Sequence, residues 1–284
     1  MQSLKSRLER GPAVLAPLVL NPLMAKLAAA AGFPALYLGG GASGYANCFL
    51  EANLTLTEMC EQALQIRAVT SLPLILDAAG GWGDPMHMHR TVATAEAAGF
   101  AAIEIEDQYL PKRAHHHIGL EHMIEKELMA AKVREAVAVR RSPEFLIIAR
   151  SNAVRASDMD DALTRAEAYK KAGADILLLS PRNADEARLI AERLPPPLMF
   201  LGAGGLRRLG LSVDEMAALG YRLLVDAQTP LLAAYKAWKA CYAALAGGLD
   251  DPSIEPQAIQ DEIHETIGLD RLLQVERQTV ESGR

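Results

Sequence analysis

The segment Pro73-Leu-Ile-Leu-Asp77-Ala-Ala-Gly80-Gly-Trp-Gly83 is a short apolar run that stops at an acid and opens into a glycine-rich loop. One helix's length further on, Ile103-Glu-Ile-Glu106-Asp107-Gln108 again carries an apolar run to acids at its end. In a parallel α/β fold, such runs are neighbouring strands whose carboxyl ends meet at the face where these folds hold their functional groups. Two acids that meet there suggest a divalent cation bound through oxygen ligands.

Asp77 and Glu106 each have an ordinary alternative role. An isolated aspartate after a strand is commonly a turn residue or a helix N-cap. Glu106 favours the functional interpretation, because it has the inward-facing parity of an acid on the strand after Asp77. Of Glu106 and Asp107, one should point into the mouth of the fold and the other away from it. We therefore expect Asp77 and Glu106 to serve in metal binding or proton transfer.

Eight short apolar runs alternate with amphipathic helical patterns along most of the 284 residues. A glycine recurs where a helical pattern gives way to a strand, as in Ala31-Gly, Ala98-Gly, Ala172-Gly and Leu219-Gly, and such glycines are natural helix C-caps. Eight strand–helix units in about 250 residues predict a closed (β/α)8 barrel, a TIM barrel of the α/β class. A doubly wound open sheet is the alternative, since periodicity alone does not show closure. The expected strands are 14–20, 35–39, 73–77, 102–106, 145–150, 175–180, 198–202 and 222–225.

The C-terminal residues depart from this alternation, and Pro252 and Pro256 separate them from the eighth helix. We expect a barrel domain at 1–249 and a C-terminal helical arm at 250–284. The arm either caps its own barrel or is exchanged with a neighbouring subunit, and the sequence leaves both open.

The composition narrows the class of protein. Half of the residues are apolar and 23% are charged, which is typical of a globular protein. A net charge of -6 without a basic cluster argues against nucleic-acid partners. Three cysteines that form no CxxC pair predict a reducing, cytoplasmic environment. No apolar run approaches the about 20 residues of a membrane helix, so no membrane partner is expected.

Arg150 ends the fifth apolar run, and an arginine there is costly to bury without a partner. It is either the partner of Asp77 or Glu106 in a structural ion pair, or a bidentate clamp on a substrate carboxylate or phosphate. The two roles are compatible, and we favour the clamp.

The long loop after the fourth strand carries Lys112 and the run His115-His-His117. Three consecutive histidines do not all face one ion in a regular element. We expect a solvated loop in which one histidine turns inward, and His116 is the candidate. With Gly119 at its end, the loop has the composition of an active-site lid.

Two glycine-rich loops follow the second and seventh strands, Gly39-Gly-Gly-Ala-Ser-Gly44 and Gly202-Ala-Gly-Gly205. Neither matches a P-loop or a dinucleotide fingerprint in the right context. Around one mouth, their backbone N–H groups favour a small anionic ligand, with Gly39, Gly40 and Gly202 as candidate contacts.

These motifs together resemble the isocitrate lyase/phosphoenolpyruvate mutase superfamily. The most specific stretch is Ile105-Glu-Asp-Gln108 followed by Pro111-Lys-Arg113. The matches fall in order between residues 20 and 240, and the others are 37–40, 54–59, 77–83, 90–92, 98–100 and 147–151. The resemblance implies a (β/α)8 barrel that binds Mg²⁺ and stabilises an enolate-like 2-oxo acid. It also implies tetramers that exchange a C-terminal helix.

The resemblance also assigns roles to residues. Asp77 and Glu106 would hold Mg²⁺, or Mn²⁺, directly or through water. Arg150 and the amides near Gly39 and Gly40 would bind substrate oxygens. Lys112 would enter the site when the lid closes.

Several positions depart from the superfamily pattern. Ala79 replaces the second acid of its Asp-x-Asp motif, and Leu50 replaces an upstream acid, with Glu51 beside it as a possible substitute. Ala114 stands where carbon–carbon lyases carry a cysteine that protonates the departing enolate. We therefore do not expect isocitrate or methylisocitrate cleavage by that mechanism, and decarboxylation gains support.

The sequence thus predicts a metal-dependent lyase that acts on a small 2-oxo or 2-hydroxy carboxylate by decarboxylation or retro-aldol cleavage. Lys112, Arg150 and His116 are the candidate catalytic residues, and the protein is expected to be a homodimer or homotetramer. One alternative is a phosphonopyruvate-type mutase or hydrolase that acts on a P–C bond. The other is a non-catalytic ligand-binding barrel, suggested by Ala79 and Leu50.

Overall fold

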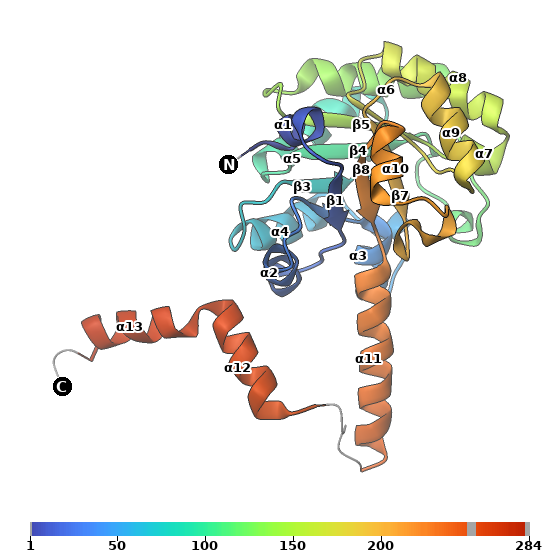
Figure 1. The fold of residues 1–284 in the computed structure, drawn as a ribbon. Helices are drawn as coiled ribbons and strands as arrows, with labels where there is room; N and C mark the ends of the chain where they lie inside the picture. Colours follow the sequence, from blue (N-terminus) through green and yellow to red (C-terminus); the bar gives the residue numbers. More distant parts are fainter. Residues whose placement is uncertain (1, 249–253, 282–284) are drawn as a thin grey trace. The chain divides into compact units, whose positions relative to one another are not determined.

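A computed structural model describes residues 2–248 and 254–281 and shows eight parallel strands (Figure 1). Their hydrogen-bonded order is β1-β8-β7-β6-β5-β4-β3-β2. The two ends of this order meet where Leu18, just after β1, bridges Tyr37 of β2, and the N–H of Val19 donates to the Tyr37 carbonyl at 2.9 Å. The predicted (β/α)8 barrel is therefore confirmed, and the open sheet was the wrong alternative.

The strands are β1 (Val14–Pro17), β2 (Leu36–Leu38), β3 (Leu74–Asp77), β4 (Ala102–Glu106), β5 (Leu146–Ser151), β6 (Ile176–Leu179), β7 (Leu198–Gly202) and β8 (Tyr221–Asp226). The α-helices are α1 (Leu4–Arg10), α2 (Pro22–Ala30), α3 (Gly40–Ala46), α4 (Leu56–Arg67), α5 (Met88–Ala97), α6 (Lys126–Val139), α7 (Ala153–Ala156), α8 (Met159–Lys171), α9 (Ala184–Arg193), α10 (Val213–Ala218), α11 (Thr229–Ala246), α12 (Pro256–Ile267) and α13 (Leu269–Thr279). Short 3-10 turns are η1 (Glu51–Asn53), η2 (Pro85–His87), η3 (Ala114–Ile118) and η4 (Gly205–Arg208).

The recurring glycines do end helices. Gly32, Gly99, Gly173 and Gly220 follow α2, α5, α8 and α10, and all have positive φ angles between 84° and 107°. Residues with side chains rarely adopt this left-handed conformation, so the glycines turn the chain from each helix into the next strand.

The core consists of two layers separated by the strands. Alternate strand residues pack against the surrounding helices, and the residues between them fill the interior of the barrel. We call the buried residues that fill the barrel the interior cluster. Leu4 and Leu8 of α1 belong to it, so this helix closes the amino end of the barrel. The opposite, carboxyl end is left to form the mouth.

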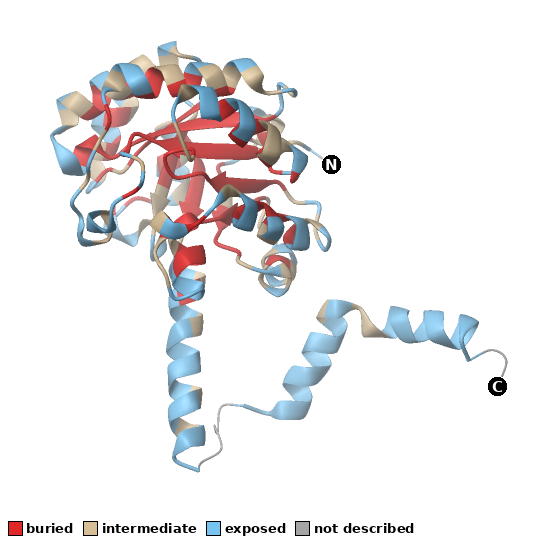
Figure 2. Cartoon of the chain, turned by 180° about the vertical axis from the view of Figure 1, so that it is seen from behind, coloured by how far each residue is buried: buried red, intermediate tan, exposed pale blue. Residues whose placement is uncertain are grey.

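The chain divides into two compact units, 1–231 and 232–284, at a point within α11. The predicted domain boundary at 249/250 lies outside the described residues. Within the second unit, α11 exposes Leu232, Tyr235, Trp238, Tyr242 and Leu245. Figure 2 shows the buried strands in red and the largely exposed α12 and α13 in pale blue. In the described part of the chain, no helix is long and apolar enough to cross a membrane.

Candidate active site

Strand parity brings four charged side chains to the interior of the mouth. Ile75, Ala102 and Ile148 belong to the interior cluster, and residues two positions further along a strand face the same side. The parallel register also pairs Asp77 with Glu104 and Glu106 with Arg150. The inward-facing charged residues are Asp77, Glu104, Glu106 and Arg150.

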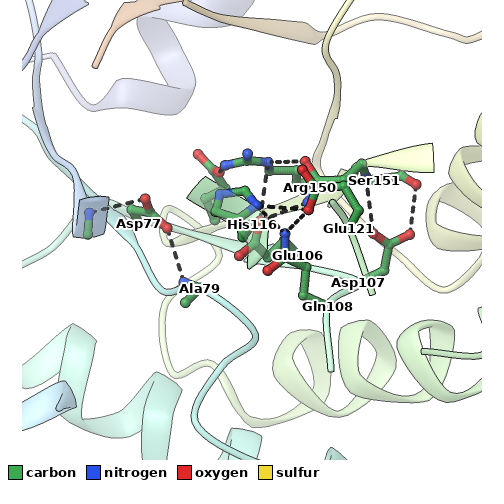
Figure 3. Close-up of polar contacts among 12 residues, drawn as sticks. Asp77, Ala79, Glu106, Asp107, Gln108, His116, Glu121, Arg150 and Ser151 are labelled. Carbon is green, nitrogen blue, oxygen red and sulfur yellow. Dashed lines mark hydrogen bonds and ion pairs between the residues drawn. The ribbon is translucent and has the colours of Figure 1, made fainter. Parts of the chain in front are cut away.

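Asp77 is held by the backbone on both of its oxygens. Its Oδ2 accepts the N–H of Gly40 at 3.1 Å, and its Oδ1 accepts the N–H of Ala79 at 3.0 Å (Figure 3). The bond to Ala79 is the ordinary turn role of an aspartate. The Gly40 amide donates to Asp77, so the expected contact of this amide with substrate stays a prediction. The metal-binding role of Asp77 also stays a prediction.

The loop after Asp77 adopts an uncommon backbone conformation. Ala79 and Trp82 have φ angles of 46° and 55°, in the left-handed region that residues with side chains seldom adopt. The loop is fixed by contacts from outside it: the Trp82 indole N–H donates to the carbonyl of Leu54 at 2.9 Å, and Lys132 Nζ donates to the carbonyl of Gly80. Lys132 is buried, and this burial lowers its pKa to about 8.

Arg150 is paired with two acids of β4. Its Nη1 donates to Glu104 Oε1 at 2.8 Å, and its Nε lies 3.4 Å from Glu106 Oε2. Asn152 completes the cluster by donating to Glu106 Oε2 at 2.9 Å. The sequence offered Asp77 or Glu106 as the partner of Arg150, and the ion pair with Glu106 is present. The carboxylate closest to the guanidinium is, however, that of Glu104.

Glu104 was not among the residues predicted from the sequence. It lies in the barrel interior, where Tyr37 donates its hydroxyl to Glu104 Oε2 at 2.8 Å. Burial raises the pKa of Glu104 to about 7, although Arg150 opposes the shift. Its parity with Glu106, two residues away, was the available signal, since both must face the same side of the strand.

Lys112 lies inside the mouth rather than in solvent. Its Nζ is 2.7 Å from Glu51 Oε2 and 2.5 Å from Glu106 Oε1. Burial alone would lower the pKa of Lys112, but these two carboxylates raise it above its usual value. Burial likewise works against ionised Glu106, yet Lys112 and Arg150 hold the pKa of Glu106 well below its usual value. Glu106 is therefore a charged carboxylate between two cations.

Glu51 is an acid with one unused oxygen. Burial and the nearby charge of Asp77 raise its pKa to about 8, against the opposing effect of Lys112. Its Oε1 is buried and has no hydrogen-bond partner among the described residues. A Cβ added to Gly40 would lie 2.8 Å from Glu51 Cγ, so a glycine is needed for the helix α3 to approach this closely.

Glu106 and Asp107 point in opposite directions, as predicted. Asp107 Oδ2 accepts hydroxyl hydrogen bonds from Ser151 at 2.7 Å and from Tyr169 at 2.8 Å, away from the mouth. Asp107 therefore joins β4 and β5 to helix α8 and leaves Glu106 as the acid of the pair that faces the site.

The histidine run contributes two side chains to the site rather than one. His116 and His117 both line the cavity at the mouth, whereas His115 lies 3.2 Å from His122. His116 Nδ1 is 2.8 Å from Glu121 Oε2 and 2.7 Å from the Gln108 amide. Consecutive residues of a 3-10 turn point in different directions, and here two of the three reach the mouth.

The cavity at the mouth has a volume of about 90 Å³. It brings together Asp77, Arg150 and His116 with Gly39, all predicted from the sequence, and with Glu51. The complete lining is Tyr37, Gly39, Gly41, Ala42, Tyr45, Glu51, Asp77, His116, His117, Arg150, Leu201, Ala227 and Gln228.

Gly202 lies beside this cavity, whose lining includes its neighbour Leu201. The backbone N–H groups of the loop that follows donate hydrogen bonds to side chains of the protein. Gly204 N–H donates to Thr229 Oγ1 at 2.7 Å, and Gly205 N–H donates to Asp226 Oδ2 at 3.2 Å. Anion binding by this loop therefore has less support than the sequence suggested.

The donors at the mouth fit a divalent cation in their chemistry. Residues 2–248 and 254–281 contain no ready-made cluster of three or more His, Cys, Asp or Glu side chains for a metal ion. Acids nevertheless outnumber cations at the mouth, and the Oε1 of Glu51 is the kind of hard oxygen ligand that Mg²⁺ and Mn²⁺ prefer.

Comparison with known proteins assigns the family. The family model described as phosphoenolpyruvate phosphomutase matches residues 4–246. The chain belongs to this family. The superfamily resemblance found in the sequence is thereby confirmed.

Two curated relatives carry names of enzymes that break carbon–carbon bonds. The 2,3-dimethylmalate lyase of Eubacterium barkeri is 34% identical over 269 residues, which cover 93% of this chain and 92% of the relative. The oxaloacetate decarboxylase of Pseudomonas putida is 36% identical over 227 residues, which cover 78% of this chain and 76% of the relative. The predicted class, a carbon–carbon lyase of small carboxylates, is confirmed at this level.

A solved structure of phosphonopyruvate hydrolase in complex with oxalate and Mg²⁺ has the same fold. It superposes with a TM-score of 0.85 at 27% sequence identity and covers 98% of both chains. Divalent metal is thus found in a structural neighbour of this protein.

Proposed function

We propose that this protein is a divalent-metal-dependent lyase that cleaves a carbon–carbon bond of a small 2-oxo or 2-hydroxy carboxylate. The observation that carries the proposal is the mouth itself, where Arg150 pairs with Glu104 and Glu106, and Lys112 pairs with Glu51 and Glu106. The cationic groups suit an anionic substrate, and the carboxylates suit a hard metal ion. The reaction class of the relatives supports the same conclusion.

Asp77, Glu106 and Glu51 are the residues that would hold Mg²⁺ or Mn²⁺. Bound there, the ion would supply positive charge to substrate oxygens on which negative charge develops as the bond breaks. Glu51 then serves as the substitute for the acids missing at Leu50 and Ala79, and its Oε1, unpaired within the described residues, supports this role.

Arg150 would bind a substrate carboxylate. Its guanidinium is fixed by Glu104, Glu106 and Asn152, and it lines the cavity. A guanidinium that is held in place loses little conformational freedom when it binds a second anion. Tyr37 and Glu104 therefore act behind it, as residues that position Arg150.

In decarboxylation, the bond to the leaving carboxylate breaks, CO2 departs, and the electron pair remains on the neighbouring carbon until a proton joins it. Ala114 carries no acid for this proton. His116, which lines the cavity, and Lys112, which pairs with the cavity residue Glu51, are the groups that can supply it, and solvent is the other source. A reaction that needs no strong acid in the lid therefore suits this chain better than isocitrate-type cleavage.

Two measurements test the proposal. The first is turnover of oxaloacetate, 2,3-dimethylmalate and phosphonopyruvate with Mg²⁺ or Mn²⁺, for the wild type and Asp77→Ala. Turnover of a carboxylate that is lost in the variant is expected. Turnover of phosphonopyruvate alone would favour P–C bond chemistry instead.

The second measurement is calorimetric binding of Mg²⁺ and Mn²⁺ with and without oxalate. Oxalate-dependent binding that disappears in Asp77→Ala is the expected result. Absence of binding and of turnover in the wild type would favour a non-catalytic binding role.

A homo-oligomer, a dimer or a tetramer, is proposed on the basis of the exposed apolar residues of α11. Leu232, Tyr235, Trp238, Tyr242 and Leu245 recur every three or four residues and so form one stripe along the helix. Sedimentation of the wild type and of Trp238→Glu tests this. A cytoplasmic location also remains a prediction, supported by three free cysteines.

A further inference from the structure

Lys112 is a cation enclosed between two acids from different parts of the chain. Its side chain is 3% exposed, and the carboxylates of Glu51 and Glu106 that contact it are 5% and 1% exposed. Water screens the charge of an exposed lysine, whereas the buried ammonium of Lys112 interacts mainly with these two carboxylates. Its ammonium therefore fills the space between turn η1 and the end of strand β4.

The mouth contains more acidic side chains than basic ones. Among the described residues, four acids face two cations there: Glu51, Asp77, Glu104 and Glu106 against Lys112 and Arg150. The Oε1 of Glu51, which has no partner in the described part of the chain, shows that hydrogen-bond acceptors are also in excess.

We propose that Lys112 is an internal counter-ion that competes with the divalent cation for Glu51 and Glu106. The inference rests on the metal site of the proposed function and adds a residue that opposes its occupation. A divalent ion binds carboxylate oxygens at about 2.0–2.6 Å, and the ammonium already lies 2.5–2.7 Å from the same two carboxylates. The ammonium and the divalent ion cannot both occupy the space between these two carboxylates, and the two cations repel each other.

Departure of Lys112 from this position would change the loop that carries it. Lys112 lies between β4 and η3, and its two ion pairs fasten this segment to the floor of the mouth. Once Lys112 leaves, the segment loses these contacts and the ammonium becomes available to an anionic substrate. Metal binding would thus precede the rearrangement of the loop.

Calorimetric titration with Mn²⁺ alone tests the competition. Lys112→Met removes the competing charge and keeps a long side chain, and it should lower the Kd for Mn²⁺ at least tenfold. Lys126→Met is the matched control, because Lys126 lies at the start of α6, where it pairs with Glu127 at 3.8 Å. The control should bind Mn²⁺ like the wild type. Unchanged or weaker binding by Lys112→Met would overturn the proposal.

A second measurement uses the unmodified protein and does not depend on the folding of a variant. Trypsin cleavage after Arg113, an exposed residue, reports the state of the segment, and cleavage after the exposed Arg207 is the internal reference. Mn²⁺ should increase cleavage after Arg113 relative to the reference. If the ratio stays constant or falls when Mn²⁺ binds, Lys112 does not leave its acids.

The outcomes separate this inference from the proposed function. Asp77-dependent Mn²⁺ binding by the wild type, without tighter binding by Lys112→Met, removes the inference and leaves the lyase proposal. No Mn²⁺ binding by either protein, with or without oxalate, removes both. Binding by Lys112→Met alone supports the inference and shows that Lys112 excludes the ion from the free protein.

Discussion

The mouth of the barrel has two unlike halves. On β3, β4 and β5, the inward-facing residues are Asp77, Glu104, Glu106 and Arg150, which we call the charged half. Toward the carboxyl ends of β6, β7 and β8, the residues packed in or against the interior cluster include Leu178, Leu201, Val225 and, just after β8, Ala227, which we call the apolar half. Three neighbouring strand ends thus carry chemistry, and the next three form a packing surface.

The difference between the halves shows how a symmetric fold acquires a directional site. Leu201 and Ala227 line the same cavity as Asp77 and Arg150. A small carboxylate in this cavity would place its charged end on one half and its carbon skeleton on the other. The charged half should therefore control activity, and the apolar half should control fit.

Removal of Arg150 should have the largest effect. Arg150→Met leaves Glu104 and Glu106 without their shared cation, and loss of one partner of a buried ion pair costs about 3–5 kcal/mol. We expect kcat/KM to fall at least about a thousandfold, as for loss of a charge-stabilising group. Denaturant unfolding and steady-state kinetics measure the two effects. Near-normal activity of the variant would place the chemistry outside the charged half.

A single methyl group at position 40 should give the next largest effect. Gly40→Ala places a Cβ 2.8 Å from Glu51 Cγ and 2.9 Å from its Oε1, and overpacking of this kind costs about 1–3 kcal/mol. Gly41→Ala is the control, since its Cβ would come no closer than 3.9 Å to Glu51. Thermal unfolding of both variants is the measurement. Equal stabilities would mean that the approach of α3 to Glu51 is not tight.

Change in the apolar half should be milder. Leu201→Ala removes a half-buried side chain, so it should cost about 1 kcal/mol, below the range for fully buried leucine. KM should change severalfold, with kcat nearly constant, because the lost contact binds substrate and transition state alike. A fall in kcat as large as that of Arg150→Met would contradict the division into halves.

The last prediction concerns the pH dependence of stability in the support behind the charged half. The folded-state pKa of Lys132 is lowered from 10.5 to about 8 by burial, so the unfolded chain binds more protons between these values. Stability should then rise with pH in this window, by at most about 1.4 kcal/mol per pH unit, relative to Lys132→Met. The measurement is the difference in unfolding free energy between the two proteins from pH 7.5 to 10. A difference that is constant or falls over this range would show that Lys132 stays charged.

The barrel and most of the charged half were predictable from the sequence. Strand parity and acid positions were enough to place Asp77, Glu106 and Arg150 at one mouth, because these depend on local geometry. Glu104 was missed because only the strand end was considered, although parity also places the residue two positions earlier in the interior. The role of Glu104 is to pair with Arg150, which lies on the neighbouring strand.

The contacts of the loops were less predictable. The pairing of Lys112 with Glu51 joins residues 61 positions apart, and no local sequence pattern predicts it. The amides of Gly204 and Gly205 looked available in the sequence, but Thr229 and Asp226 of the next strand–helix unit accept them. Loop contacts of this kind depend on tertiary structure, so neither propensity nor spacing predicts them.

The two tryptophans give this protein a pair of built-in fluorescent reporters. Trp82 is half-buried in the loop after Asp77, with its indole N–H bonded to the Leu54 carbonyl, so its emission should lie toward the blue. Trp238 is 53% exposed on α11, so its emission should lie toward the red and be quenched by iodide. The blue component would then follow events at the mouth and the red component would follow coverage of the helix, in one unlabelled sample.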